Sequence, residues 1–196
     1  RVLLLCGIVS SLLYIAMNVF IPLQWEGYSF ASRVPSELSA VGAPTRPLWV
    51  PLGIAYGVLM TAFGSGVWAA ARGNRSLRVV GALIIAYGAI GLAPWPPMHQ
   101  REVLAAGGGT LTDTLHIVWT AVTVLLMMLA IGFGAAAFGK RFRFYSVATM
   151  VTLVGFGALT GMAAPRMQAN LPTPWIGASE RISIGVFLLW VVVLAV

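Results

Sequence analysis

The residues best suited to chemistry gather in one stretch of this sequence, from Pro94 to Thr120. This stretch holds both histidines, His99 and His116, and two of the five acidic residues, Glu102 and Asp113. Two imidazoles with a carboxylate are adequate ligands for a zinc ion, which lowers the pKa of a bound water and turns it into a nucleophile. The same groups also form hydrogen-bonded ion pairs that tie loops together. A metal site and a cluster of ion pairs are therefore both compatible with these residues.

The spacing of Asp113 and His116 places them on one face of a helix, because residues three apart lie next to each other on its surface. His116 falls about one turn inside an apolar segment, and an ionisable residue at that depth marks a functional site by default. Asp113 also has a structural interpretation, since Thr110 and Asp113 have the spacing of a capping box. His99 follows Trp-Pro-Pro, which stiffens the chain before it.

Other ionisable residues lie in separate hydrophilic stretches. We expect Glu37, His99, Asp113 and His116 to meet in one outward-facing pocket, because charge at bilayer depth is tolerated only beside compensating partners. Arg46 or Arg181 is expected to balance the carboxylates. The predicted ligand-binding residues are Glu37, Arg46, His99, Asp113, His116, Glu180 and Arg181. The alternative is a salt-bridge cluster that only holds the loops together.

A metal site would use His99, His116 and Asp113. The sequence has neither H-E-x-x-H nor C-x-x-C, and it has two histidines in all. The expectation is therefore that no metal or other cofactor is bound, with zinc as the alternative.

Composition indicates the class of protein that must position these residues. Hydrophobic residues make up 59% of the 196, charged residues 9%, and the mean hydropathy is +0.91. A soluble domain has about a quarter charged residues, so this chain lacks the polar surface of a water-soluble globule. One cysteine, Cys6, excludes an intrachain disulfide. The chain is predicted to be an integral membrane protein.

Six apolar segments approach the length of about 20 residues that a membrane-spanning helix needs. They predict an all-α fold, a compact bundle of six transmembrane helices in a single domain over residues 1–196. The chain begins with Arg rather than Met and stops within an apolar run, which predicts trimmed ends. The predicted spans are residues 2–23, 49–71, 79–94, 113–138, 145–164 and 182–196.

The connections between these segments alternate between short and long. The two short connections, RGNRSLR and GKRFRF, are basic and contain no acid, whereas all five acids lie in or beside the long ones. Positive residues in short loops mark the cytoplasmic side, so the short connections and both termini are predicted to be cytoplasmic. The net charge of +7 is therefore a topology signal, and no basic stripe with interleaved aromatic residues indicates nucleic-acid binding.

The long outer loops have structure of their own. Pro35 to Val41 is predicted to form a short re-entrant or interfacial turn of helix, started by proline and ended by Gly42. Four tryptophans fall at the outer boundary, where aromatic residues commonly form a belt at the membrane surface. They are Trp25, Trp49, Trp95 and Trp175.

Glycines recur within the spans at helical spacing. Small residues four apart let two helix backbones approach closely in lipid, so these pairs predict contact seams. The predicted seams are Gly53 with Gly57, Gly157 with Gly161, and the row Gly81, Gly88 and Gly91.

Four stretches together resemble a known family. They are SELSAVGAPTRPLW at 36–49, WPPMH at 95–99, DTLH at 113–116 and PTPWIGASER at 172–181. This pattern resembles the six-span prokaryotic membrane proteins catalogued as domain of unknown function 998, and the resemblance covers essentially the whole chain. It implies a six-helix fold in the prokaryotic cytoplasmic (inner) membrane and no established activity. More distantly, the chain is similar to the Frag1/DRAM/Sfk1 membrane proteins, whose roles concern lipids and membrane organisation.

Two classes of function follow from the sequence. The first, which we favour, is a non-catalytic membrane protein that binds a lipid or small amphiphile in the outward-facing pocket, or serves as a subunit of a membrane complex. Its partners would be membrane lipids and other membrane subunits. The alternative is an intramembrane metal-dependent hydrolase, with Ser36 or Ser39 contacting the substrate. A transporter is less favoured, because no charged residue lies at the middle of a span.

Overall fold

The computed structural model describes residues 1–92 and 95–196, and in these ranges the regular structure is helical. Ala93 and Pro94, where the third predicted span ends and the histidine-bearing stretch begins, lie outside the described residues. The long helices are α1(Val2–Phe20), α2(Arg46–Ala70), α3(Arg75–Ile90), α5(Leu111–Ala137), α6(Lys140–Gln168) and α7(Ile176–Ala195).

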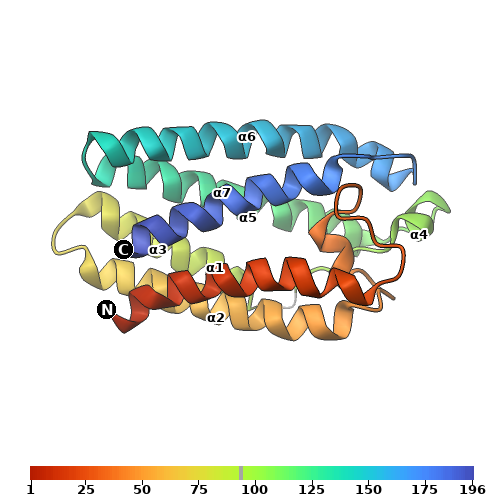
Figure 1. Cartoon of the computed structure of the whole chain (residues 1–196), viewed down its shortest axis with the longest axis horizontal. Helices are drawn as coiled ribbons and strands as arrows, with labels where there is room; N and C mark the ends of the chain where they lie inside the picture. Colours follow the sequence, from red (N-terminus) through yellow and green to blue (C-terminus); the bar gives the residue numbers. More distant parts are fainter. Residues whose placement is uncertain (93–94) are drawn as a thin grey trace.

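The long helices run side by side along the length of the molecule (Figure 1). Each packs on the next in the chain, and α7 returns to pack on α1. Both termini and the connections at 71–74 and 138–139 lie at one end of the bundle, which we call the basic end. The three long connections lie at the opposite end, which we call the loop end. The predicted alternation of short and long connections therefore separates the two ends of the molecule.

Five of these helices are long and apolar enough to cross a membrane, which makes the chain an integral membrane protein. α3 has 16 residues, fewer than the roughly 20 that a straight crossing requires. The five segments are Val2–Gln24, Arg46–Ala70, Leu111–Ala137, Lys140–Gln168 and Ile176–Ala195.

Three short helices lie in the connections at the loop end: η1(Pro22–Gln24), η2(Pro35–Ser39) and α4(Arg101–Ala105). Where the sequence predicts a turn of helix from Pro35 to Val41, the structure has the 3-10 helix η2. Its first turn is held by the buried carboxylate of Glu37, which accepts the Val34 N–H at 2.9 Å. This local bond places Glu37 on the inner side of the loop.

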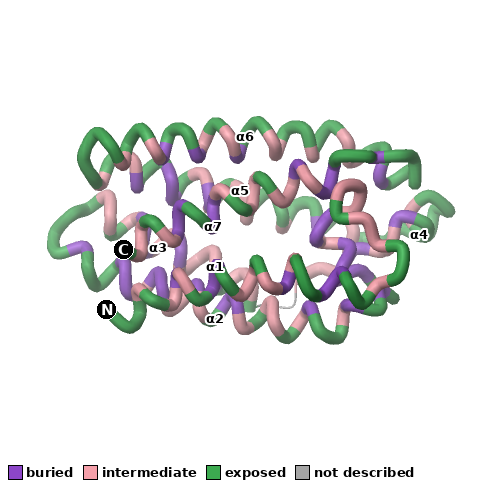
Figure 2. The backbone as a smooth tube through the Cα atoms, viewed as in Figure 1, coloured by how far each residue is buried: buried purple, intermediate pink, exposed green. Residues whose placement is uncertain are grey.

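The main core of the bundle lies toward its basic half and combines aliphatic with aromatic side chains. Phe63 of α2 and Phe187 and Trp190 of α7 are almost completely buried. The indole N–H of Trp190 donates to Ser146 Oγ at 3.0 Å, which gives the buried donor a partner. Figure 2 shows this buried zone together with the long exposed stretches of α6, which has the lowest buried share of the candidate spans.

A second cluster of buried residues closes the loop half of the bundle. Trp49 packs there with Met17, Ile21 and Leu38 and is 6% exposed. Its ring meets that of Tyr14 edge-on, with centroids 5.9 Å apart. The assignment of Trp49 to a membrane-surface belt is therefore wrong. Trp49 lies near a helix end, as a belt residue would, but its side chain packs against the loops.

The glycine seam between α2 and α3 is confirmed for Gly57 and the row Gly81, Gly88 and Gly91, whereas Gly53 faces the ring of Trp95. A Cβ atom on Gly57 would lie 3.0 Å from the carbonyl oxygen of Gly88, and one on Gly88 would lie 2.6 Å from the nitrogen of Thr61. The seam predicted for Gly157 and Gly161 is wrong, since nothing lies within 4 Å of a Cβ at either position. Spacing predicts a smooth helix face, but the rotation of α6 in the bundle decides what that face meets.

α7 begins at Ile176, six residues before the predicted boundary, so Glu180 and Arg181 lie inside a helix. The reason is a cap supplied from far away in the sequence. The backbone N–H groups of Gly177 and Ala178 donate to the Ala31 carbonyl at 2.8 and 3.2 Å. The first loop thus satisfies amide donors that a helix start otherwise leaves unpaired.

Candidate functional site: a buried ion-pair network at the loop end

The centre of the loop end is an ion pair between Glu37 and Arg101. Arg101 Nε donates to Glu37 Oε1 at 2.9 Å, and Nη2 donates to Oε2 at 2.7 Å. The glutamate is 0% exposed and the arginine 6%. A two-pronged, charge-assisted contact of this kind is among the strongest polar contacts that proteins form.

Arg33 extends this pair into a chain of alternating charge. Its Nη1 donates to Glu37 Oε1 at 3.2 Å, and its Nη2 donates to Glu102 Oε1 at 3.0 Å. Two arginines therefore face two glutamates. Buried charge is tolerated when it is paired and hydrogen-bonded, and this network meets both conditions.

The network joins all three long connections. Arg101 also donates to Thr173 Oγ1 at 3.2 Å and to the Ser32 carbonyl at 3.1 Å. Thr173 in turn donates to the same Ser32 carbonyl at 3.1 Å. Since Ser32, Arg101 and Thr173 come from different connections, the loop end is one connected structure.

His99 and Asp113 form a second, separate pair. His99 Nδ1 lies 2.9 Å from Asp113 Oδ2, and the His99 backbone N–H donates to Oδ1 at 2.6 Å. Asp113 Oδ2 also accepts the Thr110 N–H at 2.8 Å, as the capping-box spacing predicts. One carboxylate therefore caps α5 and anchors the segment that carries His99.

His116 does not join that pair. Its Nδ1 donates to the carbonyl of Pro96 at 2.8 Å, and a carbonyl partner requires the proton to be on that nitrogen. The side chain is buried against the Trp-Pro-Pro segment, and Trp95 stacks on Trp119 with ring centroids 6.3 Å apart. His116 thus fixes the course of the loop over α5.

The two arginines expected to balance the carboxylates have other partners. Arg46 donates to the Ser39 carbonyl. Arg181 Nη1 donates to the carbonyls of Phe30 and Arg33 at 2.8 and 2.9 Å. The expectation that either pairs with a carboxylate is wrong, because loop carbonyls lie where these side chains reach. Arg33 and Arg101 neutralise Glu37 instead.

Tyr28 completes the arginine cluster. Arg181 Nη2 donates to the Tyr28 hydroxyl at 2.7 Å, and the hydroxyl donates to the carbonyl of Val34 at 3.1 Å. Burial raises the pKa of Tyr28 to about 12, against the opposing effect of Arg181. The neutral phenol therefore bridges α7 and the first loop, because it accepts a hydrogen bond from Arg181 and donates one to the carbonyl of Val34.

Glu180 differs from the other predicted residues. Among the hydrogen bonds and ion pairs of the described residues, none involves its carboxylate, although it stands in the second turn of α7. Asn18, on the neighbouring helix α1, has a buried Oδ1 that has no hydrogen-bond partner among the residues that the structure describes. The side-chain N–H of Asn18 donates to the Tyr14 carbonyl at 3.0 Å. The carboxylate of Glu180 and the side-chain oxygen of Asn18 are thus two acceptors without a partner among the described residues, on helices that pack on each other.

The ligands of the alternative zinc site do not assemble. Within residues 1–92 and 95–196, no three His, Cys, Asp or Glu side chains are arranged to hold a metal ion. His99 and His116 each engage Nδ1 with a different partner, Asp113 and the Pro96 carbonyl.

Sequence reasoning missed four residues of the network: Tyr28, Arg33, Arg101 and Thr173. One signal was present for Arg101, since it stands beside Glu102 in the hydrophilic stretch that carries His99. A glutamate buried in an apolar protein requires a cationic partner, but spacing does not say which arginine the loops bring to it.

The comparisons with known proteins identify a family without a described activity. No curated protein and no solved structure matches the chain. One family model, described as "Protein of unknown function (DUF998)", matches residues 8–196. Because this match covers almost the entire chain, the protein belongs to the DUF998 family of proteins of unknown function.

Proposed function

We propose that the protein crosses a prokaryotic cytoplasmic membrane six times, with α3 as the remaining span and the basic end in the cytoplasm. A crossing by α3 is supported by its position, since it runs beside α2 and α5 along the bundle. Its 16 residues extend about 24 Å at 1.5 Å per residue, and local thinning of the bilayer accommodates such a shortfall. The orientation is supported by the six basic residues at the short connections.

Within this topology, the protein is a non-catalytic binder of a lipid or small amphiphile, and Glu180 accepts hydrogen bonds from its head group. The observation that carries this proposal is the contrast between Glu180 and its neighbours. Glu37 and Asp113 are each satisfied by several donors, whereas the carboxylate of Glu180 has none among the described residues. A charged residue at the centre of a span costs about 2.5 to 3.5 kcal/mol, and the smaller cost near the end of a span is offset by a bound partner.

The polar groups around Glu180 define the chemistry of the ligand. Asn18 Oδ1 is an unpaired acceptor, like the carboxylate of Glu180. Arg181 follows Glu180 in α7; its Nη atoms are occupied by loop carbonyls and Tyr28, whereas its buried Nε–H is a donor without a partner among the described residues. The two acceptors require donors and the Arg181 Nε–H requires an acceptor, so the head group carries hydroxyl groups, or an ammonium together with an oxygen acceptor. The apolar part of the ligand would lie along the lipid-facing helices.

The test is analysis of co-purifying amphiphiles after gentle detergent extraction, comparing the wild-type protein with Glu180→Gln. The matched control is Glu26→Gln, which neutralises an exposed acid at the same end. We expect a stoichiometric amphiphile with an amine or hydroxyl head in the wild type and the control, and at least tenfold less in Glu180→Gln at unchanged helix content. A wild-type protein without amphiphile, or equal retention by Glu180→Gln, would refute the proposal.

A further inference from the structure

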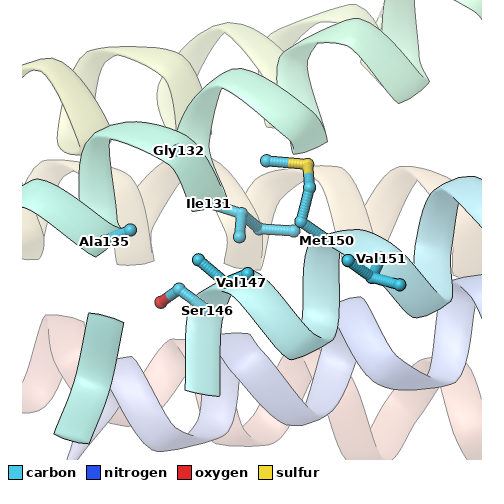
Figure 3. A pocket seen from close by; sticks show the side chains of 7 residues that line it. All are labelled: Ile131, Gly132, Ala135, Ser146, Val147, Met150 and Val151. Atoms are coloured by element: carbon cyan, nitrogen blue, oxygen red, sulfur yellow. The ribbon is translucent and has the colours of Figure 1, made fainter. Parts of the chain in front are cut away.

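A hollow opens between α5 and α6 in the half of the bundle away from the loops (Figure 3). Its volume is about 110 Å³. A second hollow of about 320 Å³ lies along α5 and shares Gly132 with the first. The first is lined by Ile131, Gly132, Ala135, Ser146, Val147, Met150 and Val151.

The lining of the first hollow is apolar. Its single hydroxyl, on Ser146, is engaged with the indole N–H of Trp190 at 3.0 Å. Val147 and Val151, on its α6 wall, are 52% and 66% exposed, so the hollow faces outward from the bundle. In a membrane-spanning segment this surface meets lipid, and an acyl chain is the apolar group available to fill it.

Basic residues stand above this hollow at the start of α6. Lys140, Arg141 and Arg143 are exposed. Arg143 Nε donates to the carbonyl of Ala135 at 3.3 Å, and Ala135 is part of the lining. The guanidinium of Arg143 is thereby held at the mouth. All five acids belong to the loop end, so no carboxylate competes for these cations.

The depth of the hollow matches one leaflet of a bilayer. Along α6, Ser146 lies about 9 Å and Val151 about 16 Å beyond Lys140, at 1.5 Å per residue. Half of the hydrocarbon core is about 15 Å thick. A lipid phosphate beside Lys140 and Arg141 would therefore place its acyl chain alongside the hollow. Basic residues beside inter-helix pockets are typical of sites for anionic lipid head groups.

We propose that an anionic phospholipid binds here, with its phosphate held by Lys140, Arg141 and Arg143 and one acyl chain in the hollow at Gly132. This site is at the opposite end of the bundle from Glu180, so it is independent of the proposed amphiphile site. The occupant is an intact phospholipid because charge and hollow act together: the cations attract the phosphate, and the hollow accepts the chain.

The experiment measures lipid binding to the full chain by native mass spectrometry. The probes are phosphatidylglycerol and phosphatidylcholine with identical acyl chains, and glycerol 3-phosphate as a chain-free competitor. Gly132→Leu fills the hollow. A Cβ there meets only Met150 Cε at 3.8 Å, so the helices need not separate. Lys140→Gln with Arg141→Gln removes two of the cations.

The controls are the same changes made elsewhere. Gly155→Leu adds the same side chain to an open position on α6, and Arg72→Gln with Arg75→Gln removes two of the three cations of the other basic connection. We expect phosphatidylglycerol to bind at least tenfold tighter than phosphatidylcholine. Both site variants should lower that affinity at least tenfold, and both controls should change it less than twofold. Glu180→Gln should leave it unchanged.

Other outcomes would overturn the proposal. Equal binding of the two phospholipids would show that the cations do not select the head group. Unchanged binding by Gly132→Leu would show that the hollow does not hold the acyl chain. Effective competition by glycerol 3-phosphate would indicate a phosphate site without an acyl chain. A lipid-free dimer that Gly132→Leu disrupts would assign the surface to a second copy of the chain. If Gly132→Leu does not fold, Val147→Trp blocks the same hollow from its exposed rim.

Discussion

Arg101 binds both carboxylate oxygens of Glu37 across 64 residues of sequence, at 2.9 and 2.7 Å. This contact joins the first and second long connections, and the arginine also reaches Thr173 of the third. The loop end therefore combines this charged network with an apolar cluster of its own, whereas the basic half is held by aliphatic and aromatic packing. Two of the five acids, Glu37 and Glu102, belong to this network, and Asp113 belongs to the separate pair with His99.

Removing the charge of Glu37 should destabilise the protein strongly. Glu37→Gln leaves Arg101 without a counter-charge and Arg33 with Glu102 alone, and breaking a buried pair in this way costs about 3–5 kcal/mol. The measurement is thermal unfolding in detergent. Glu102→Gln is the control, because its partly exposed pair with Arg33 should contribute less than about 1 kcal/mol. Equal losses from both substitutions would contradict a buried centre at Glu37.

Stability should fall in alkaline solution through Tyr28. Burial raises the pKa of its hydroxyl from the ordinary 10.0 to about 12. The unfolded chain therefore releases this proton at lower pH than the folded protein does. The contribution is fully present below pH 10, and it is lost as the pH rises to about 12. The measurement is the unfolding temperature of wild type and Tyr28→Phe from pH 9 to pH 12. The decline should be shallower in the variant, and identical declines would exclude Tyr28 as a source.

Leucine should be tolerated at one glycine and not at another. Gly88→Leu should lower the unfolding temperature, because even its Cβ would lie 2.6 Å from the Thr61 nitrogen and force α2 and α3 apart. Gly157→Leu should have little effect, since nothing lies within 4 Å of that position. Thermal unfolding of the two variants beside the wild type measures the difference. Marked destabilisation by Gly157→Leu would show that α6 has a neighbour on this face.

The orientation in the membrane can be measured with single cysteines in a Cys6→Ser background. A cysteine at Asn74 or Gly139, at the basic end, should resist an impermeant thiol reagent in intact cells. A cysteine at Gly108, in the connection that carries α4, should react. Labelling after cell lysis shows that each cysteine is accessible in principle. The opposite pattern in intact cells would place the basic end outside.

The sequence by itself determined the class of the protein and the polarity of its two ends. Hydropathy and the charge of the connections are sums over consecutive residues, so they predict the class of the protein without knowledge of which residues contact each other. The α2–α3 seam was also predictable, because glycine at helical spacing favours close approach and α2 and α3 are joined by a short connection. The capping of α5 by Asp113 was predictable for a similar reason, since donor and acceptor are three residues apart.

Only the tertiary structure decided which long-range partners meet. Glu37 lies within ten residues of Arg46 yet pairs with Arg101, because the paths of three loops bring that guanidinium to it. The early start of α7 depends on the Ala31 carbonyl, about 145 residues away, and the open face of Gly157 depends on how α6 is rotated. Side-chain types and local spacing do not specify loop paths or helix rotations. Those follow from the packing of the whole bundle, which also leaves Glu180 without a partner among the described residues.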